Sequence, residues 1–278
     1  MKSDKNKPAL LQDLKLYGSS YIHMENKLSI LLPVLWTLPY RTRRVIFKKI
    51  FKKEYWRILS ARHELEISFT HHENKHLTYS INAFHEKKCI FVHIPKCGGI
   101  SLAQSLLGHC VPHSTITDYQ IMFDSSTFNN YFKFTFTRNP WDRLVSAYFF
   151  LKEGGFDSKD KALLTPFIEQ HPTFSNFVEF LYYHREYLQL THFAPQSKWI
   201  KTPSGKIPFD YIGRLESLDD SVSEIRTNLG IEYDIKPKKL NISTRNSDFR
   251  GYYTKKTRTM VDELYREDIK LLGYQFDA

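Results

Sequence analysis

Cysteine is scarce in this chain: Cys89, Cys97 and Cys110 are the three among 278 residues. An odd number leaves at least one thiol outside any disulfide, and no CxxC pair occurs. This pattern excludes a disulfide-built scaffold and favours a reducing compartment. Neither the cysteines nor the histidines of the segment 1–85 stand at zinc-ligand spacing, so the sequence predicts no metal site.

Long apolar runs are also missing. The most apolar stretch, 28–40, is shorter than the roughly 20 residues that a membrane-spanning helix needs. The lysine-rich start precedes no apolar core with a small-residue cleavage site, so we expect no cleavable signal peptide. Residues 41–53 then mix cations with apolar side chains, which is typical of a basic amphipathic helix. Such a helix either lies on a membrane surface, with 28–53 as the peripheral contact, or packs on its own domain by its apolar stripe.

Acidic residues are outnumbered, since 30 Asp and Glu stand against 40 Lys and Arg and give a formal net charge of +10. This excess favours an anionic partner such as a nucleotide, a polyanionic sugar, a lipid surface or nucleic acid, although the same charge can simply keep a protein soluble. A hydrophobic content of 41% with 15% aromatics excludes a disordered chain. The length allows one full-sized core.

Two parts of the chain differ in charge and in the pattern of their apolar residues. Residues 1–85 are basic and predict a mainly helical extension, whereas residues 86–278 alternate short β-rich runs with amphipathic stretches. Alternation of this kind predicts an α/β domain with a central parallel sheet, in which ligands bind beyond the carboxyl ends of the strands. The expected strands are 89–94, 131–137 and 209–213, and the expected helices are 101–108, 141–152, 173–188, 217–229 and 254–272.

The first candidate site follows the strand 89–94. Gly98 and Gly99 let the backbone approach an anion closely, and the helix that opens there presents N–H groups and the positive end of its dipole. Lys96 adds a point charge and Ser101 a hydroxyl. The result is an anion cradle but no Walker A motif, because the lysine precedes the glycines and the next strand ends in arginine instead of a magnesium-binding aspartate.

The second candidate site follows the strand 131–137. Arg138 stands at its carboxyl end, where a guanidinium can grip a phosphate through two parallel hydrogen bonds. Pro140 suits the first turn of the next helix. Ser146 lies about two turns beyond Arg138 and can face the same anion. The alternative is an ordinary capped helix with an incidental arginine.

Both segments resemble signatures of the sulfotransferase superfamily: 95–101 is similar to its 5′-phosphosulfate loop, and 138–146 to its 3′-phosphate motif. The residues of both motifs look like those of the carbohydrate sulfotransferase branch, which includes the chondroitin, dermatan, HNK-1 and heparan uronyl 2-O enzymes and many bacterial relatives. The resemblance covers roughly 88–274, and Ile100 departs from it because many members have Thr there. Shorter matches lie at 192–196, 212–216 and 265–268.

The resemblance implies a P-loop-like three-layer fold that binds 3′-phosphoadenosine-5′-phosphosulfate as co-substrate and requires no metal. It implies that the 5′-phosphosulfate is held by Lys96, Cys97, Gly98, Gly99, Ile100 and Ser101. It assigns the 3′-phosphate to Arg138 and Ser146. Further contacts are expected from Arg214, Ser243 and Arg245, although Arg214 could equally pair with Glu216.

Transfer of a sulfuryl group needs in-line positioning, charge stabilisation and a base for the acceptor hydroxyl. Lys96 can neutralise charge on the leaving oxygen. Histidine suits the base near neutral pH. His113 is the first candidate, because the related uronyl enzymes place a catalytic histidine in that region, and His192 is the second. The remaining candidates are His109, Asp118 and Glu153.

We therefore expect a sulfotransferase acting on a hydroxyl of a polysaccharide or glycolipid, polyanionic ones included, with no nucleic-acid partner. The alternatives are a P-loop-type kinase or other nucleotide enzyme, and a non-catalytic basic module that binds nucleic acid or membrane. Animal relatives are Golgi membrane proteins with an anchor. A complete chain of this sequence is expected in the bacterial cytoplasm, with peripheral contact to the inner membrane, and a truncated eukaryotic form in the Golgi.

Overall fold

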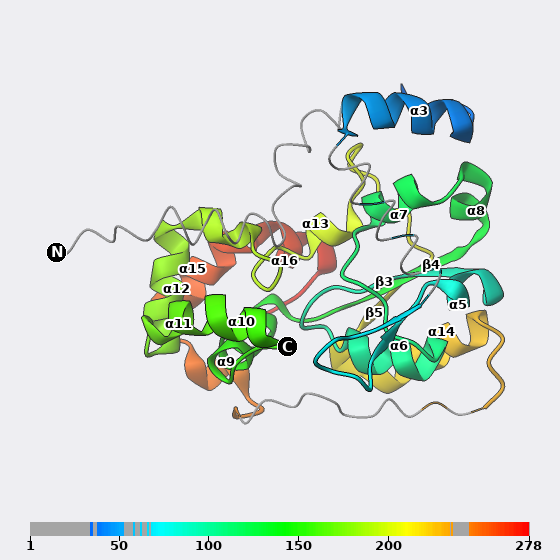
Figure 1. Cartoon of the computed structure of the whole chain (residues 1–278). Coiled ribbons are helices and arrows are strands. Elements are labelled where there is room, and N and C mark those ends of the chain that lie inside the picture. The colour runs from blue at the N-terminus through cyan, green and yellow to red at the C-terminus, as the bar shows by residue number, and fades with distance from the viewer. Residues whose placement is uncertain are drawn as a thin grey trace. The chain divides into compact units, whose positions relative to one another are not determined.

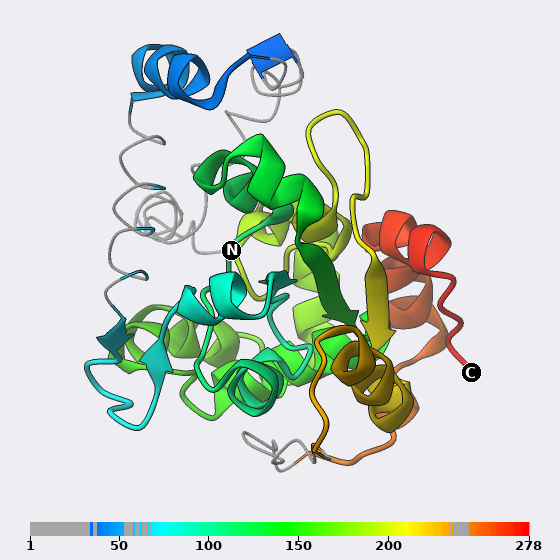
Figure 2. The ribbon, with the colours of Figure 1, turned by 90° about the vertical axis from the view of Figure 1, so that its right-hand side faces the viewer.

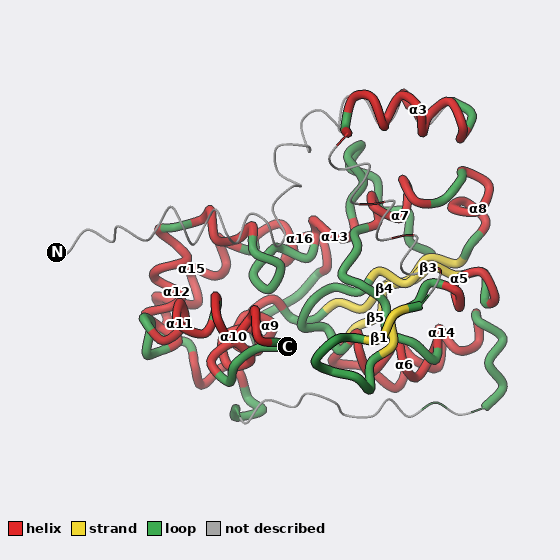
Figure 3. The backbone as a smooth tube through the Cα atoms, viewed as in Figure 1, coloured by secondary structure: helices red, strands yellow, loops and turns green. Residues whose placement is uncertain are grey.

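A computed structural model describes residues 34–35, 38–52, 58, 62, 66, 68–233, 235 and 245–277 (Figure 1). The chain divides into two compact units. The first, here called the sheet unit, comprises 25–138 and 196–241, and the second, the helical unit, comprises 139–195 and 242–278 together with 1–24. The described strands all belong to the sheet unit (Figure 3).

The sheet unit is built on three parallel strands in the order β3 (Cys89–Val92), β4 (Phe132–Thr137) and β5 (Tyr211–Arg214). Figure 2 shows the arrows of β4 and β5 running in the same direction. The strand β3 is buried at every position, as an apolar run in a covered parallel sheet should be. The predicted α/β fold with a central parallel sheet is therefore confirmed.

Helices cover both faces of this sheet. On one side lie α6 (Gly99–Leu107) and α14 (Leu218–Asn228), and on the other lie α7 (Ile116–Met122) and α8 (Ser125–Asn130) (Figure 1). The remaining elements of these layers are α5 (Asn82–Glu86), α13 (Ser197–Ile200) and the 3-10 turn η3 (Leu215–Ser217). The predicted strands and helices occur in the predicted order, and the strand ends differ from the prediction by at most two residues.

The N-terminal part of the sheet unit contains the basic helix α3 (Tyr40–Ile50). Arg43 and Phe47 are buried on one side of this helix, and the Arg43 guanidinium donates to the Phe123 carbonyl at 3.0 Å. The helix thus packs on its own unit, one of the two arrangements that the sequence allows. Within the segment predicted as mainly helical, β1 (Phe69–Thr70) and β2 (Thr78–Tyr79) form a short antiparallel pair instead. No helix in the described ranges is long and apolar enough to cross a membrane.

The helical unit has an aromatic-rich core of its own. The predicted helix 254–272 is divided at Tyr265, because the ring of Tyr265 is buried and its hydroxyl donates to the Phe193 carbonyl at 2.7 Å. The Trp141 side chain is likewise buried, and its Nε1 donates to Asp262 at 2.8 Å. The elements of this unit are α9 (Pro140–Lys152), α10 (Ser158–Leu163), α11 (Thr165–Glu169), α12 (Phe174–Tyr183), η2 (Arg185–Gln189), η4 (Phe249–Tyr252), α15 (Lys255–Leu264) and α16 (Arg266–Leu272).

Candidate functional site

The loop that follows β3 contains two residues with left-handed backbone. Lys96 has a φ of 69° and Gly98 a φ of 74°, and α6 begins directly afterwards at Gly99. Glycine adopts this conformation without cost, whereas a residue with a side chain does so only where the surrounding structure holds it. Strain at Lys96 is therefore built into the loop that carries the predicted phosphate-binding lysine, as is common at binding sites.

Gly99 is required at its position by a histidine. A Cβ added there would lie 1.8 Å from Cδ2 of His93, far inside van der Waals contact. His93 is only 4% exposed, and its Nδ1 lies 3.2 Å from the Val111 carbonyl, which can only accept. Burial lowers the pKa of His93 to about 4, so its ring is neutral at physiological pH. The helix α6 can start this close to β3 only because Gly99 leaves room for that ring.

Arg138 follows the last residue of β4 and reaches the Lys96 loop. Its Nη1 donates to the Lys96 carbonyl oxygen at 3.0 Å. The register of the sheet places Arg214, the last residue of β5, beside Thr137. The structure therefore brings the Lys96 loop, Arg138 and the end of β5 to one edge of the sheet. This is the edge at which α/β proteins bind ligands.

Gln196 contacts both motifs, although the sequence alone predicts no role for it. Its side chain is fully buried; Oε1 accepts from the backbone N–H of Arg138 at 3.0 Å, and Nε2 donates to the Arg138 carbonyl at 2.7 Å. The Cys97 thiol donates to the same Oε1 at 3.4 Å. Cys97 thus turns its sulfur toward Gln196 and shapes the loop. The only sequence signal for Gln196 was its place in the short match 192–196.

His113 lies against the end of β3. Its Nδ1 is 3.0 Å from the His93 carbonyl oxygen, and the two imidazole rings are 4.1 Å apart between centroids. A carbonyl oxygen can only accept, so Nδ1 carries the hydrogen and, in the neutral ring, Nε2 carries the lone pair. The His113 ring is exposed and lies 6.0 Å from that of Trp199. This arrangement gives His113 the tautomer that a general base needs.

Asp118, a further base candidate, takes part in a helix cap. Its carboxylate accepts from the Thr115 backbone N–H at 2.8 Å and the Thr115 hydroxyl at 3.0 Å, which closes a capping box at the start of α7. Burial raises the pKa of Asp118 to about 7. These hydrogen bonds account for the place of Asp118 in the first turn of α7, and its role as a base stays a prediction.

Four of the described candidate residues belong to the helical unit: Ser146, Glu153, His192 and Arg245. Ser146 is buried on α9. His192 places Nε2 at 3.5 Å from Asp160. Arg245 donates to Asp142 at 2.6 Å. Their predicted roles toward the nucleotide and acceptor stay predictions, and Ser243 lies outside the described residues.

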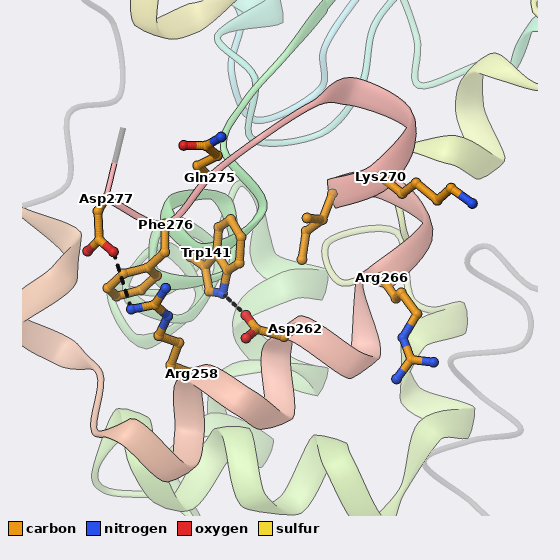
Figure 4. A pocket seen from close by; sticks show the side chains of 9 residues that line it. Trp141, Arg258, Asp262, Arg266, Lys270, Gln275, Phe276 and Asp277 are labelled. Atoms are coloured by element: carbon orange, nitrogen blue, oxygen red, sulfur yellow. Dashed lines mark hydrogen bonds and ion pairs between the residues drawn. The ribbon is translucent and has the colours of Figure 1, made fainter.

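The helical unit also carries a hollow of about 530 Å³, walled by Trp141 and Phe276 (Figure 4). Its carboxylates are already engaged. Asp262 accepts from the Trp141 indole, and Asp277 lies 3.3 Å from the Arg258 guanidinium, which also stacks 4.3 Å above the Phe276 ring.

Two further cations stand at the margin of this hollow, Arg266 and Lys270 of α16. Neither side chain makes an ion pair with another described residue (Figure 4). The hollow is therefore a weakly cationic, partly aromatic surface. No group of three or more potential metal ligands occurs among the described residues.

The fold and the loop-and-arginine edge define an α/β protein of the P-loop-like class. The model of the sulfotransferase family matches residues 79–275. The chain therefore belongs to the sulfotransferase family. Neither the curated proteins nor the solved structures compared with it include a match.

Proposed function

We propose that this protein transfers a sulfuryl group from 3′-phosphoadenosine-5′-phosphosulfate to a hydroxyl of a carbohydrate. The observation that carries the donor assignment is the contact between Arg138 Nη1 and the Lys96 carbonyl at 3.0 Å. It puts the guanidinium of the second motif beside the anion loop of the first. A donor with a 5′-phosphosulfate and a 3′-phosphate has the two anionic groups that such a pair of motifs fits.

The residues around the loop suit that donor. The α6 N-terminus follows Gly98, which is exposed and has no side chain to obstruct an anion. The N–H groups of the first turn and the helix dipole favour negative charge there. Lys96 is half-buried, which strengthens its attraction to an anion relative to open water. Arg138 offers a fork of donors for the 3′-phosphate.

In the proposed reaction His113 is the general base. Nε2 of its neutral ring takes the proton from the acceptor hydroxyl, and the acceptor oxygen forms a bond to sulfur. The bond between sulfur and the bridging oxygen of the donor breaks, and 3′,5′-ADP leaves with both electrons of that bond. Lys96 stabilises the charge that develops on the leaving oxygen. The product is a sulfate monoester, and the proton remains on His113.

Thermal unfolding with two ligands tests the donor assignment. We expect 3′,5′-ADP to raise the melting temperature and ATP with Mg²⁺ to raise it less, because the chain has no Walker A lysine. A larger shift with ATP and Mg²⁺ would favour a kinase. No shift with either nucleotide, together with salt-dependent DNA binding, would favour a non-catalytic basic module.

An acidic carbohydrate is the acceptor class that we infer. The support is the hollow walled by Trp141 and Phe276, with Arg266 and Lys270 at its margin. Aromatic walls pack against sugar rings, and cations pair with carboxylates or sulfates. The double variant Arg266→Ala/Lys270→Ala should raise the KM for acidic acceptors only. A charge-matched control is Lys161→Ala/Lys255→Ala, which removes two exposed cations outside the hollow. Equal effects of the two double variants would refute this role.

We also propose peripheral contact between α3 and an anionic membrane. Beside its buried side, α3 leaves Val45 56% and Ile50 48% exposed. The exposed cations on and just after this helix are Arg41, Lys48, Lys49 and Lys52. Apolar side chains among cations are the pattern of helices that lie on anionic lipid. Co-sedimentation with phosphatidylglycerol vesicles, but not with phosphatidylcholine vesicles, is expected, and Lys48→Glu/Lys49→Glu should abolish it. Equal sedimentation with both lipids would contradict the proposal.

A further inference from the structure

Gln196 holds the backbone of Arg138 as a neighbouring strand would. The strand β4 ends at Thr137, so the next residue has passed the last register pair of the sheet. At that point the amide of Gln196 takes both polar groups of Arg138, accepting from N–H at 3.0 Å and donating to the carbonyl at 2.7 Å. A buried amide that satisfies both groups fixes the direction in which the Arg138 side chain leaves the backbone.

The same amide also contacts the anion loop. The Cys97 thiol donates to Gln196 Oε1 at 3.4 Å, and Arg138 Nη1 donates to the Lys96 carbonyl at 3.0 Å. Three contacts therefore close a triangle of Gln196, Arg138 and the loop 96–97. In this triangle the loop and the arginine are not independent, because each is held against Gln196.

Gln196 and Arg138 also mark the two points where the chain passes between its compact units. The first segment of the sheet unit ends at Arg138, and its second segment begins at Gln196. The two hydrogen bonds therefore join the residues that flank the segment 139–195 in the sequence. A substitution that removes the Gln196 amide would leave the backbone N–H and carbonyl of Arg138 without these two hydrogen bonds.

We propose that Gln196 is a positioning residue that sets the spacing between the Lys96 loop and the Arg138 guanidinium, and thereby the preference for a nucleotide with a 3′-phosphate. This proposal rests on the proposed sulfuryl donor. Gln196 acts through Arg138 and touches no substrate. Loss of its two hydrogen bonds is expected to cost the protein the 3′-phosphate contact and to leave the 5′-phosphate contact largely intact.

The test is a double-variant cycle read by calorimetric binding of 3′,5′-ADP and 5′-AMP. Gln196→Met keeps the volume and removes the hydrogen bonds. We expect it to reduce the preference for 3′,5′-ADP by about tenfold, the usual size for one hydrogen bond to a charged group. We expect Arg138→Ala/Gln196→Met to show the same preference as Arg138→Ala alone. Gln120→Met is the matched control, since Gln120 lies on α7 and its Oε1 has no hydrogen-bond partner in the described structure.

The results distinguish an error in the proposed donor from an error in the proposed role of Gln196. If the wild-type protein does not prefer 3′,5′-ADP, the proposed donor is wrong. If the wild type shows the preference and Gln196→Met keeps it, or if the two losses multiply in the double variant, the role of Gln196 is wrong. Should Gln196→Met fail to fold, Gln196→Glu replaces it. Its preference relative to wild type should recover as pH falls, because only the protonated carboxyl can donate to the Arg138 carbonyl, and an unchanged ratio would also overturn the proposal.

Discussion

The side-chain amide of Gln196 makes hydrogen bonds with both backbone polar groups of Arg138, at 3.0 Å and 2.7 Å. Removing a partner from a buried polar group costs about 1–3 kcal/mol. We therefore expect Gln196→Met to lower the free energy of unfolding by about 2 kcal/mol. Urea denaturation of Gln196→Met and of the control Gln120→Met measures this, and the control should lose almost nothing. Equal losses in the two variants would mean that the substitution itself, and not the contact with Arg138, destabilises the protein.

Arg138 should distinguish nucleotides by their 3′-phosphate. Arg138→Ala is expected to weaken 3′,5′-ADP binding by at least about tenfold while 5′-AMP binding stays near the wild-type value, because a charged hydrogen-bond pair to the 3′-phosphate is lost. Arg138→Lys should fall between the two, since a lysine keeps the charge but lacks the planar fork. Calorimetry with both nucleotides measures these affinities. Parallel losses for both nucleotides would show a general effect on the loop.

His113 should be needed for turnover and not for nucleotide binding. His113→Ala removes the proposed base, and loss of a general base lowers turnover by about 10²–10⁴-fold. Affinity for 3′,5′-ADP should stay within about threefold of the wild type, since no charged contact is removed. His109→Ala and His192→Ala are measured alongside, and His109→Ala should be nearly silent. Retained turnover in His113→Ala, with loss in His192→Ala, would transfer the role of base to His192.

Two substitutions of Lys96 separate the effect of its charge on the reaction from the effect of its backbone strain on stability. Its φ of 69° is left-handed, so Lys96→Gly should be more stable than Lys96→Ala by about 1 kcal/mol. Both variants lack the ammonium group and should lose about 10²-fold in transfer rate or more. Urea denaturation and rate measurements on the two variants check both halves. If Lys96→Ala is the more stable variant, the left-handed conformation at this position is wrong.

His93 should make the free energy of unfolding depend on pH in the acidic range. Its folded pKa, about 4, lies below the value of about 6.5 expected in an unfolded chain. A histidine with a lowered pKa favours the folded state while neutral, so its contribution is present above about pH 6.5 and is lost as pH falls toward 4, to a total of about 3 kcal/mol. In His93→Asn the amide can keep the bond to the Val111 carbonyl without titrating.

Urea denaturation at about pH 7 and about pH 4.5 measures this term. The loss of stability between the two pH values should be smaller in His93→Asn than in the wild type. Asp118, whose buried carboxyl has a raised pKa, contributes equally to both proteins and cancels in the comparison. The same acid sensitivity in the two proteins would contradict a buried, neutral His93.

The sequence predicted the sheet and the two anion motifs because local patterns specify them. Apolar β-rich runs followed by Lys96 and Arg138 need no knowledge of distant residues. Contacts between distant residues were not predictable in this way. Gln196 meets Arg138 across 58 positions, and the ring of His93 excludes a side chain at Gly99 only when the strand and helix are packed together. Neither relationship leaves a periodic signal.

Local patterns also do not predict where a helix is interrupted. The stretch 254–272 has a continuous amphipathic pattern, yet the chain breaks it at Tyr265, whose hydroxyl bonds to the Phe193 carbonyl. Tertiary packing there overrides helix propensity. The roles of Ser146, His192 and Arg245 depend on the nucleotide and acceptor, so neither the sequence nor the contacts within the helical unit decide them.

Transfer of radiolabel tests most directly whether the protein moves a sulfuryl group. The purified full chain is incubated with ³⁵S-labelled 3′-phosphoadenosine-5′-phosphosulfate and a panel of capsular, lipopolysaccharide and glycosaminoglycan acceptors. We predict that label enters a carbohydrate with the wild-type protein and does not with Lys96→Ala or Arg138→Ala. Transfer of ³²P from labelled ATP to the same acceptors, with no transfer of ³⁵S, would contradict the account.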